Sequence, residues 1–244
     1  MEIQVCSSLE ELGQKAASDG VAAINRAVSD HGEANILVAT GASQFSTLGV
    51  LTAQTVEWTR VEAFHLDEYV GLSADHPASF RRYLRERFVS QISGLRAFHE
   101  VGGDSDTIAE LSRLNALIKG RRIDVAFIGI GENGHLAFND PPADFAEERP
   151  YIVVRLDHKC RQQQVGEGWF PSVEAVPEQA ISMSISQILR ATTIVVSVPD
   201  QRKAQAVRDA VEGPVDPSCP ASILQQHPDC TLYLDKDSAS LLSG

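Results

Sequence analysis

The sequence predicts a single α/β domain built around a mostly parallel sheet. The first observation is an alternation of short apolar strands with amphipathic helices along most of the 244 residues. The second is that the sequence contains no internal repeat, low-complexity tract or linker. The length agrees, because 244 residues suit one larger domain or two small ones and can bury a sizeable core.

The N-terminal half supplies most of the predicted elements. Ser8 and Glu11 are spaced as a capping box, and the helical pattern behind them ends at about residue 31, before Gly32. The segment IDVAFIGI is apolar throughout, which is typical of a strand buried on both faces. The pattern predicts strands at 35–40, 61–66, 95–100 and 123–130, and further helices at 45–54, 78–88 and 107–120.

The alternation of strands and helices becomes less regular after the N-terminal half. Residues 157–177 show no clear period and are mostly polar. Trp169 and Phe170 in this segment fit either a lid over a site or the anchor of a loop. Beyond it the pattern predicts a strand at 192–198, a helix at 201–211 and a last strand at 231–235, after a segment at 181–191 of undetermined type.

The composition narrows the class of partner. The formal net charge is -12, and the absence of a Lys/Arg cluster argues against nucleic acid and anionic membranes. Four scattered cysteines without a CxxC motif indicate free thiols in a reducing compartment. The sequence starts without a signal peptide and has no apolar run long enough for a membrane span. We therefore expect a cytoplasmic protein.

The residues just after the strands are the candidates for a site, because ligands of parallel α/β sheets bind beyond the carboxyl ends of the strands. Four such loops are expected to converge on one edge. They are TGASQ at 40–44, DEY at 67–69, GENGH at 131–135 and PDQRK at 199–203.

The first and last loops carry groups suited to an anion. The glycine and Ser43 of TGASQ, with free N–H groups at the next helix start, suit a phosphate. Taken alone, this loop favours an ordinary strand-to-helix turn, since it matches neither the Walker pattern nor GxGxxG. Lys203 is the available cation if a phosphate binds, although a solvated lysine is the commoner case.

The middle loops carry groups suited to proton transfer. Asp67 beside Glu68 at the end of an apolar strand is a plausible general base with a raised pKa, and equally a pair of capping acids. His135 has Asn133, Asn139 and Asp140 close enough in sequence to orient an imidazole. We expect no metal site, because no other His or Cys lies at zinc-like spacing.

At these residues the sequence resembles the glucosamine-6-phosphate deaminase (isomerase) family, as a divergent member. LDEYVGL, then HPxS and later GHLAFN, form a specific combination. The matching stretches run in order over nearly the whole chain: ATGASQ at 39–44, FHLDEYVGLSADHPASF at 64–80, GIGENGHLAFNDP at 129–141, RKAQAVRDAVEGPV at 202–215 and PASILQQHP at 220–228.

The resemblance implies a modified Rossmann-like sheet with helices on both faces and no metal or organic cofactor. It implies conversion of an aldose 2-amino-6-phosphate into a ketose 6-phosphate and ammonia. His135 would open the sugar ring, and Asp67 would carry the proton from C2 to C1. Asn133 and Asp140 would orient the histidine. Phosphate and substrate contacts would come from these residues: Gly41, Ala42, Ser43, Gln44, Lys203, Glu68 and Gly134.

The chain departs from the family at the histidine's neighbours. Well-studied members have an aspartate where Asn133 stands and a glutamate where Asp140 stands. Asn133 can orient an imidazole but cannot stabilise its cation. The NGHL setting also resembles relatives that act on galactosamine 6-phosphate, so either epimer of the sugar fits.

A second departure lies in the predicted lid at 157–177. Gly168 stands near the position of a family arginine that grips the phosphate, and Arg161 or Lys159 are candidates to replace it. The chain ends soon after its last strand, without the C-terminal extension of members activated by N-acetylglucosamine 6-phosphate. We therefore expect simple saturation kinetics, and we leave open a homo-oligomer.

Two other functions remain open from the sequence. A 6-phosphogluconolactonase shares the fold and a GHxA histidine motif, but would hydrolyse an ester without releasing ammonia. A non-catalytic sugar-phosphate sensor is the alternative outside enzymes, although the sequence has no basic helix pair for DNA.

Overall fold

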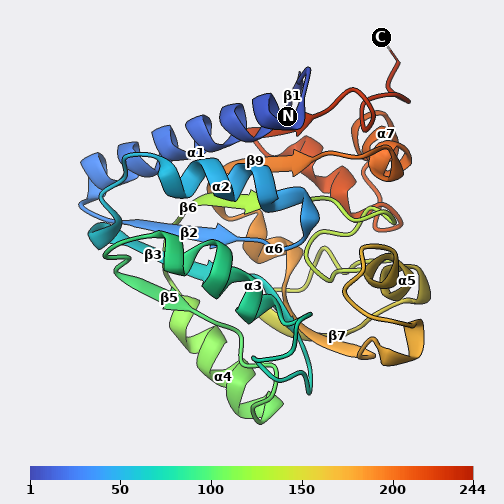
Figure 1. Cartoon of the computed structure of the whole chain (residues 1–244), viewed down its shortest axis with the longest axis horizontal. Helices are drawn as coiled ribbons and strands as arrows, with labels where there is room; N and C mark the ends of the chain where they lie inside the picture. Colours follow the sequence, from blue (N-terminus) through green and yellow to red (C-terminus); the bar gives the residue numbers. More distant parts are fainter. Residues whose placement is uncertain (244) are drawn as a thin grey trace.

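The computed structural model describes residues 1–243. Its main sheet has seven strands in the order β1-β10-β9-β6-β2-β3-β5, and every neighbouring pair is parallel. The predicted parallel α/β fold is therefore confirmed (Figure 1). The strands are β1 Glu2–Val5, β2 Ala34–Val38, β3 Val61–His65, β5 Ala97–His99, β6 Ile123–Ile128, β9 Ala191–Val198 and β10 Cys230–Leu234.

Helices cover both faces of this sheet, because successive strand residues point to opposite sides. Leu37 belongs to the core under α4, α6 and α7, whereas Ile36 and Val38 belong to the core under α1, α2 and α3. Helices α1 and α2 lie side by side over their face (Figure 1). The helices are α1 Leu9–His31, α2 Phe45–Ala53, α3 Phe80–Arg87, α4 Thr107–Ile118, α5 His158–Gly166, α6 Ile185–Ile188 and α7 Ala204–Glu212.

The boundaries follow local chemistry where the sequence carried a clear signal. The Ser8 hydroxyl accepts a hydrogen bond from the Glu11 backbone N–H, as an N-cap does. Gly32 ends the helix with φ of 80°, a left-handed conformation that glycine adopts without steric cost. The Glu11 carboxylate accepts from the N–H of Ser7 rather than Ser8, so the capping box is shifted by one residue.

A second, antiparallel sheet was not predicted. It contains β4 Asp67–Tyr69, β8 Gln179–Met183 and β7 Tyr151–Arg155, in the order β4-β8-β7. β4 has three residues and is separated from β3 by Leu66 alone, so the pattern merges the two strands. The consequence for the site is direct, since Asp67 leaves the main sheet and pairs opposite Ser182.

The polar segment 157–177 contains a helix that the sequence pattern also missed. α5 is capped by the Asp157 carboxylate, which accepts from the Cys160 N–H at 2.5 Å. Its polar residues are spread around the helix, so no apolar stripe marks the period. The remaining short helices are 3-10 turns: η1 Ala42–Gln44, η2 Trp58–Arg60, η3 Val89–Gln91, η4 Val173–Ala175, η5 Gln201–Lys203 and η6 Pro220–Gln226.

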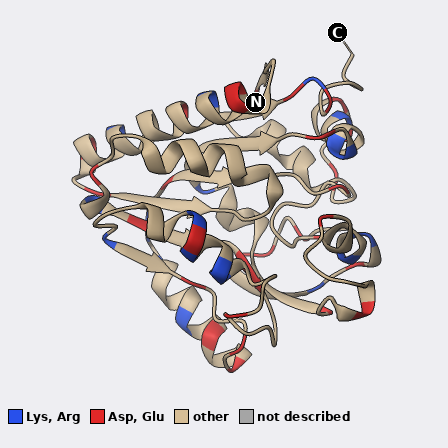
Figure 2. Ribbon diagram, viewed as in Figure 1, with Lys and Arg blue, Asp and Glu red and all other residues tan. Residues whose placement is uncertain are grey.

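Charged residues of both signs are interspersed on the elements of the fold. In the view of Figure 2, basic residues are spread over several helices and loops, with acidic residues among them. Among residues 1–243, no helix is both long and apolar enough to cross a membrane. The four cysteines are free thiols.

Candidate active site

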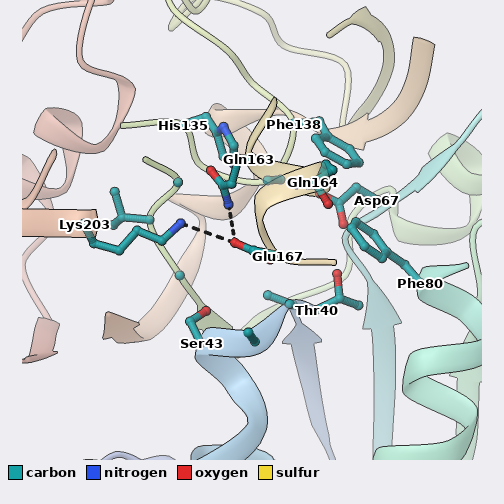
Figure 3. A pocket seen from close by; sticks show the side chains of 17 residues that line it. Thr40, Ser43, Asp67, Phe80, His135, Phe138, Gln163, Gln164, Glu167 and Lys203 are labelled. Atoms are coloured by element: carbon teal, nitrogen blue, oxygen red, sulfur yellow. Dashed lines mark hydrogen bonds and ion pairs between the residues drawn. The ribbon is translucent and has the colours of Figure 1, made fainter. Parts of the chain in front are cut away.

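A cavity lies beyond the carboxyl ends of β2, β3, β6 and β9 (Figure 3). All four strand-end loops contribute to its lining, so the structure brings together segments that the parallel topology predicted to converge. They provide Thr40, Gly41, Ala42 and Ser43 after β2, Asp67 after β3, Gly129, Gly131 and His135 after β6, and Lys203 after β9.

The loop after β2 is held from behind by Gln44. This side chain is fully buried, and its amide donates to Ser43 Oγ and to the Ile128 carbonyl, each at 3.1 Å. Gly41 has φ of 98°, and its carbonyl accepts from the Tyr83 hydroxyl at 2.9 Å. A Cβ on Gly129 would approach Ser43 Oγ to 2.9 Å, so glycine there keeps the serine in place. Gln44 therefore positions the loop rather than lining the cavity.

Asp67 is the one carboxylate that β4 turns into the cavity. Its side chain makes no hydrogen bond or ion pair with any described residue, and 5% of the residue is exposed. Burial raises the pKa of Asp67 to about 8, with the neighbouring Glu68 carboxylate as the second cause. A free carboxylate with a pKa near neutral, facing a cavity, is suited to general base chemistry.

Glu68 points the other way and is not part of the lining. Its carboxylate accepts from the Ser79 hydroxyl at 2.7 Å and from the Arg81 N–H at 2.9 Å, and it lies 3.4 Å from Arg81 Nε. It therefore caps α3 and ties β4 to that helix. This geometry gives no support to the substrate contact expected of Glu68.

His135 is oriented by Asp140, as its sequence neighbours suggested. Its Nδ1 lies 3.1 Å from Asp140 Oδ1, and the same oxygen accepts from Asn133 Nδ2 at 2.9 Å. The other Asp140 oxygen accepts from the Asp157 N–H at 2.9 Å. Burial alone would raise the pKa of Asp140, but these hydrogen bonds and the His135 charge outweigh it and hold the pKa below its usual value. Asn133 and Asp140 lie behind the histidine, outside the lining.

Two glycines in GENGH make room for this arrangement. A Cβ on Gly131 would overlap the His135 imidazole, so the ring packs directly on bare backbone. Gly134 has φ of 84° and lines a neighbouring cavity with Asn133, Lys159 and Cys219. Gly134 therefore shapes the turn, and it does not line the main cavity.

The group most suited to a metal ion is His135, Asp140 and Cys160, whose ligand atoms lie within 4.8 Å of one another. Burial raises the pKa of the Cys160 thiol well above its usual value, which disfavours the thiolate that binds metal. Asp140 is already saturated with hydrogen bonds. The geometry describes a hydrogen-bonded cluster rather than a metal centre.

Sequence reasoning expected a lid at 157–177 but did not identify the residues by which α5 and its C-terminal end line the cavity. Gln163, Gln164 and Glu167 line the cavity, and Glu167 Oε1 lies 3.7 Å from Lys203 Nζ (Figure 3). Phe80 and Phe138 form an apolar wall, with their rings stacked at 5.5 Å. The signal available in the sequence was VGEGWF, where an acid stands between two glycines inside an otherwise polar segment.

The proposed replacements for the family arginine lie elsewhere. Arg161 Nη2 donates to the Val173 carbonyl at 2.6 Å, and Lys159 lines the neighbouring cavity. Neither residue lines the main cavity, so the geometry does not support a phosphate contact from Arg161. Gly168, with φ of 82°, has open space where a side chain would stand.

The two aromatic residues after Gly168 differ in role. Phe170 is buried and packs edge-on against Tyr69 at 5.3 Å, so it anchors the segment. Trp169 is half-buried, and its indole donates to Glu167 Oε2 at 3.1 Å. Trp169 therefore supports a residue of the cavity lining.

Comparison with known proteins identifies the family to which the chain is similar. A family model described as glucosamine-6-phosphate isomerases/6-phosphogluconolactonase matches residues 7–233. A glucosamine-6-phosphate deaminase of Exiguobacterium sibiricum is 37% identical over 206 residues, covering 84% of this chain and 80% of the relative. One from Oenococcus oeni is 33% identical over 243 residues, covering 100% of this chain and 99% of its own.

Solved structures agree with the sequence comparisons. A structure described as a monomeric glucosamine-6-phosphate deaminase has a TM-score of 0.89 at 33% identity, covering 99% of this chain and 100% of its own. A 6-phosphogluconolactonase from Shewanella baltica, with a TM-score of 0.80 at 20% identity over 96% of this chain and 97% of its own, shows a shared fold. With relatives above 30% identity along its whole length, this chain belongs to the glucosamine-6-phosphate deaminase (isomerase) family.

Proposed function

We propose that this chain converts glucosamine 6-phosphate and water into fructose 6-phosphate and ammonia. The names of its relatives support the substrate, and the observation that carries the chemistry is Asp67. An unpaired carboxylate with a pKa of about 8 faces the same cavity as His135 and Lys203. The enzyme is thus an aldose-ketose isomerase that also deaminates hydrolytically.

The reaction needs two proton movements that the site can perform. His135 takes the proton of the anomeric hydroxyl and returns a proton to the ring oxygen, which opens the ring. Asp67 then removes the C2 proton and delivers it to C1, because one carboxylate can reach two adjacent carbons. The C1 carbonyl oxygen gains a proton and the nitrogen loses one as the C2=N bond forms. Water adds to the resulting C2 imine, and loss of ammonia leaves the ketone.

The phosphate is assigned to the opposite end of the cavity. The loop with Gly41, Ala42 and Ser43 offers backbone N–H groups and a hydroxyl, and Lys203 supplies a positive charge. Burial lowers the pKa of Lys203, while the nearby carboxylates act in the opposite direction. Residues 157–177 act as a lid on this single domain, because α5 provides one wall of the cavity.

The partner of this site is thus a small sugar phosphate, in a cytoplasmic setting. Galactosamine 6-phosphate is the alternative substrate, since Asn133 and Asp140 replace the acids of well-studied members. The solved relative at 33% identity is described as monomeric, which makes a monomer the simplest expectation and a homo-oligomer the alternative.

The decisive experiment measures both products, ammonia and fructose 6-phosphate, released from glucosamine 6-phosphate. Galactosamine 6-phosphate is tested in parallel, and Asp67→Asn serves as the control. We expect both products from the wild type and a loss of at least about a hundredfold in the variant. Hydrolysis of 6-phosphogluconolactone without ammonia release from either aminosugar would refute the proposal.

A further inference from the structure

A carboxylate already occupies the phosphate end of the cavity. The Glu167 side chain is only 7% exposed, and its Oε1 accepts a hydrogen bond from Gln163 Nε2 at 2.7 Å. Its Oε2 accepts from the Trp169 indole at 3.1 Å. Figure 3 shows Glu167 between Lys203 and the side of the cavity that carries Asp67. The carboxylate is thus held inside the site on both of its oxygens.

Lys203 has the same need for an anion that a phosphate would satisfy. Its side chain is 6% exposed, and within residues 1–243 Glu167 is its one ion-pair partner, at 3.7 Å from Oε1 to Nζ. Ser43 lines the cavity beside this pair. The cation proposed to bind the phosphate is therefore already neutralised in the free protein.

Glu167 and a phosphate bound at Lys203 would repel each other. A phosphate ester carries a charge between about -1.5 and -2 at neutral pH, and repulsion between buried like charges is weakly screened. A phosphate that takes Lys203 as its cation therefore competes with the Glu167 carboxylate for the same positive charge.

The residues on either side of Glu167 carry no side chain. Glu167 follows the last residue of α5 and stands between Gly166 and Gly168. At Gly168 a Cβ would meet nothing within 4 Å, and at Gly166 it would meet only the tip of Arg202. The two glycines therefore add no side chain of their own beside the Glu167 carboxylate, and Phe170 anchors the segment.

We propose that Glu167 is an internal substitute for the substrate phosphate, displaced from Lys203 when a phosphorylated sugar binds. Glu167 is then a specificity-determining residue: it sets how strong an anion a ligand must carry to open the site. An unphosphorylated aminosugar has no anion to exchange for the carboxylate and is rejected. The inference rests on the proposed function, because it assigns the phosphate to Lys203.

The test compares phosphate binding by Glu167→Gln and by wild type. Inorganic phosphate and sorbitol 6-phosphate, which has no carbonyl group to react, are titrated by calorimetry, so that no turnover is required. Glu132→Gln is the matched control. It removes one negative charge that also acts on Lys203, but Glu132 pairs with Arg202 at 3.5 Å instead.

We expect Glu167→Gln to bind both probes at least about fivefold more tightly, and Glu132→Gln to change affinity less than about twofold, because contact interactions dominate in a buried site. Unchanged or weaker binding by Glu167→Gln would overturn the proposal, since Glu167 would then help to hold the ligand. An equal gain in both variants would also overturn it, because only the overall charge would matter.

A spectroscopic readout follows the displacement itself. The chain has two tryptophans, and Trp58→Phe leaves Trp169 as the sole indole. Release of Glu167 removes the acceptor of the Trp169 N–H, so saturating phosphate should change its emission. Unchanged emission at saturation would contradict displacement.

The two proposals fail separately. Ammonia release by the wild type without tighter probe binding by Glu167→Gln would preserve the reaction and refute the displacement. Tighter probe binding without ammonia release would preserve the displacement and refute the reaction.

Discussion

The Nδ1 atom of His135 lies 3.1 Å from Oδ1 of Asp140, and no second carboxylate contacts the imidazole among residues 1–243. Asn133 reaches the same Asp140 oxygen with an N–H group at 2.9 Å. One carboxylate therefore orients the ring, and an amide holds that carboxylate. Well-studied family members place two acids here, whereas in this chain Asp140 alone provides a negative charge beside the imidazole.

Replacing this single acid should be costly. In Asp140→Asn the histidine loses its only negative partner and its preferred tautomer, so we expect kcat to fall about a hundredfold to ten-thousandfold. The KM for the sugar phosphate should change little, since Asp140 lies outside the cavity lining. Steady-state kinetics separate the two constants, and a large change in KM alone would contradict the assignment.

Restoring the family's aspartate should not help this chain. Asn133 Nδ2 also lies 3.3 Å from Asp157 Oδ2, so Asn133→Asp would replace a donor to two carboxylates with a third carboxylate. The pKa values in this cluster would rise, and the stability gained from protonation would be present at low pH and lost as the pH rises. We expect a lower melting temperature than wild type at pH 8 and a smaller difference at pH 5, measured by thermal unfolding.

The pKa of Asp67, about 8, predicts the pH profile of the reaction. The base must be ionised, so kcat/KM should rise with pH and level off above about pH 8. A profile that is flat from about pH 6 to about pH 9, the range around that pKa, would exclude Asp67 as the titrating base.

The raised pKa of Asp67 also predicts how the folding stability changes with pH. The pKa of Asp67 is higher in the folded state than in the unfolded state, so the stabilisation by its protonated form is complete below about pH 4 and is lost as the pH rises through about 8. Asp67→Asn should therefore gain stability over wild type at pH 9 relative to pH 4. Chemical denaturation at both values measures this difference.

Gly131 is predicted to be intolerant of any side chain. In Gly131→Ala the new methyl group overlaps the His135 ring and displaces it, so kcat should fall by at least about tenfold. The matched control is Gly49→Ala in α2, where a Cβ meets nothing within 4 Å and φ is not positive. The control should keep activity and gain up to about 1 kcal/mol of stability. Equal activity of the two variants would refute the packing argument.

Local patterns in the sequence predicted the parts of this protein that depend on neighbouring residues. The apolar run from Ile123 to Ile128 is a buried strand, because a strand covered on both faces has no polar side. Ser8 begins α1 and Gly32 ends it, because capping is local chemistry. The convergence of the loops with Ser43 and Lys203 followed from parallel topology, which brings strand ends to one edge.

Other features were decided only by tertiary contacts. Asp67 and Glu68 are adjacent acids, but β4 alternates its side chains, so one faces the cavity and the other caps α3. From the sequence the two acids could only be considered together, because adjacency does not show which way each side chain points. Glu68 accepts hydrogen bonds from Ser79 and Arg81, more than ten positions away, and these act against the rise in its pKa that burial causes, whereas the Asp67 carboxylate accepts none from residues 1–243.

The position of Glu167 in the cavity could not be predicted from the sequence. The two flanking glycines are the only local feature that sets this acid apart, and a charged residue in a polar segment is usually solvated. It enters the cavity because α5 packs beside the loop after β9, which brings its carboxylate to Lys203 across 36 positions of sequence. The sequence by itself specifies the type of each side chain, and its local pattern indicates the local conformation. The partner of a buried charge depends instead on which distant segments meet in the folded protein.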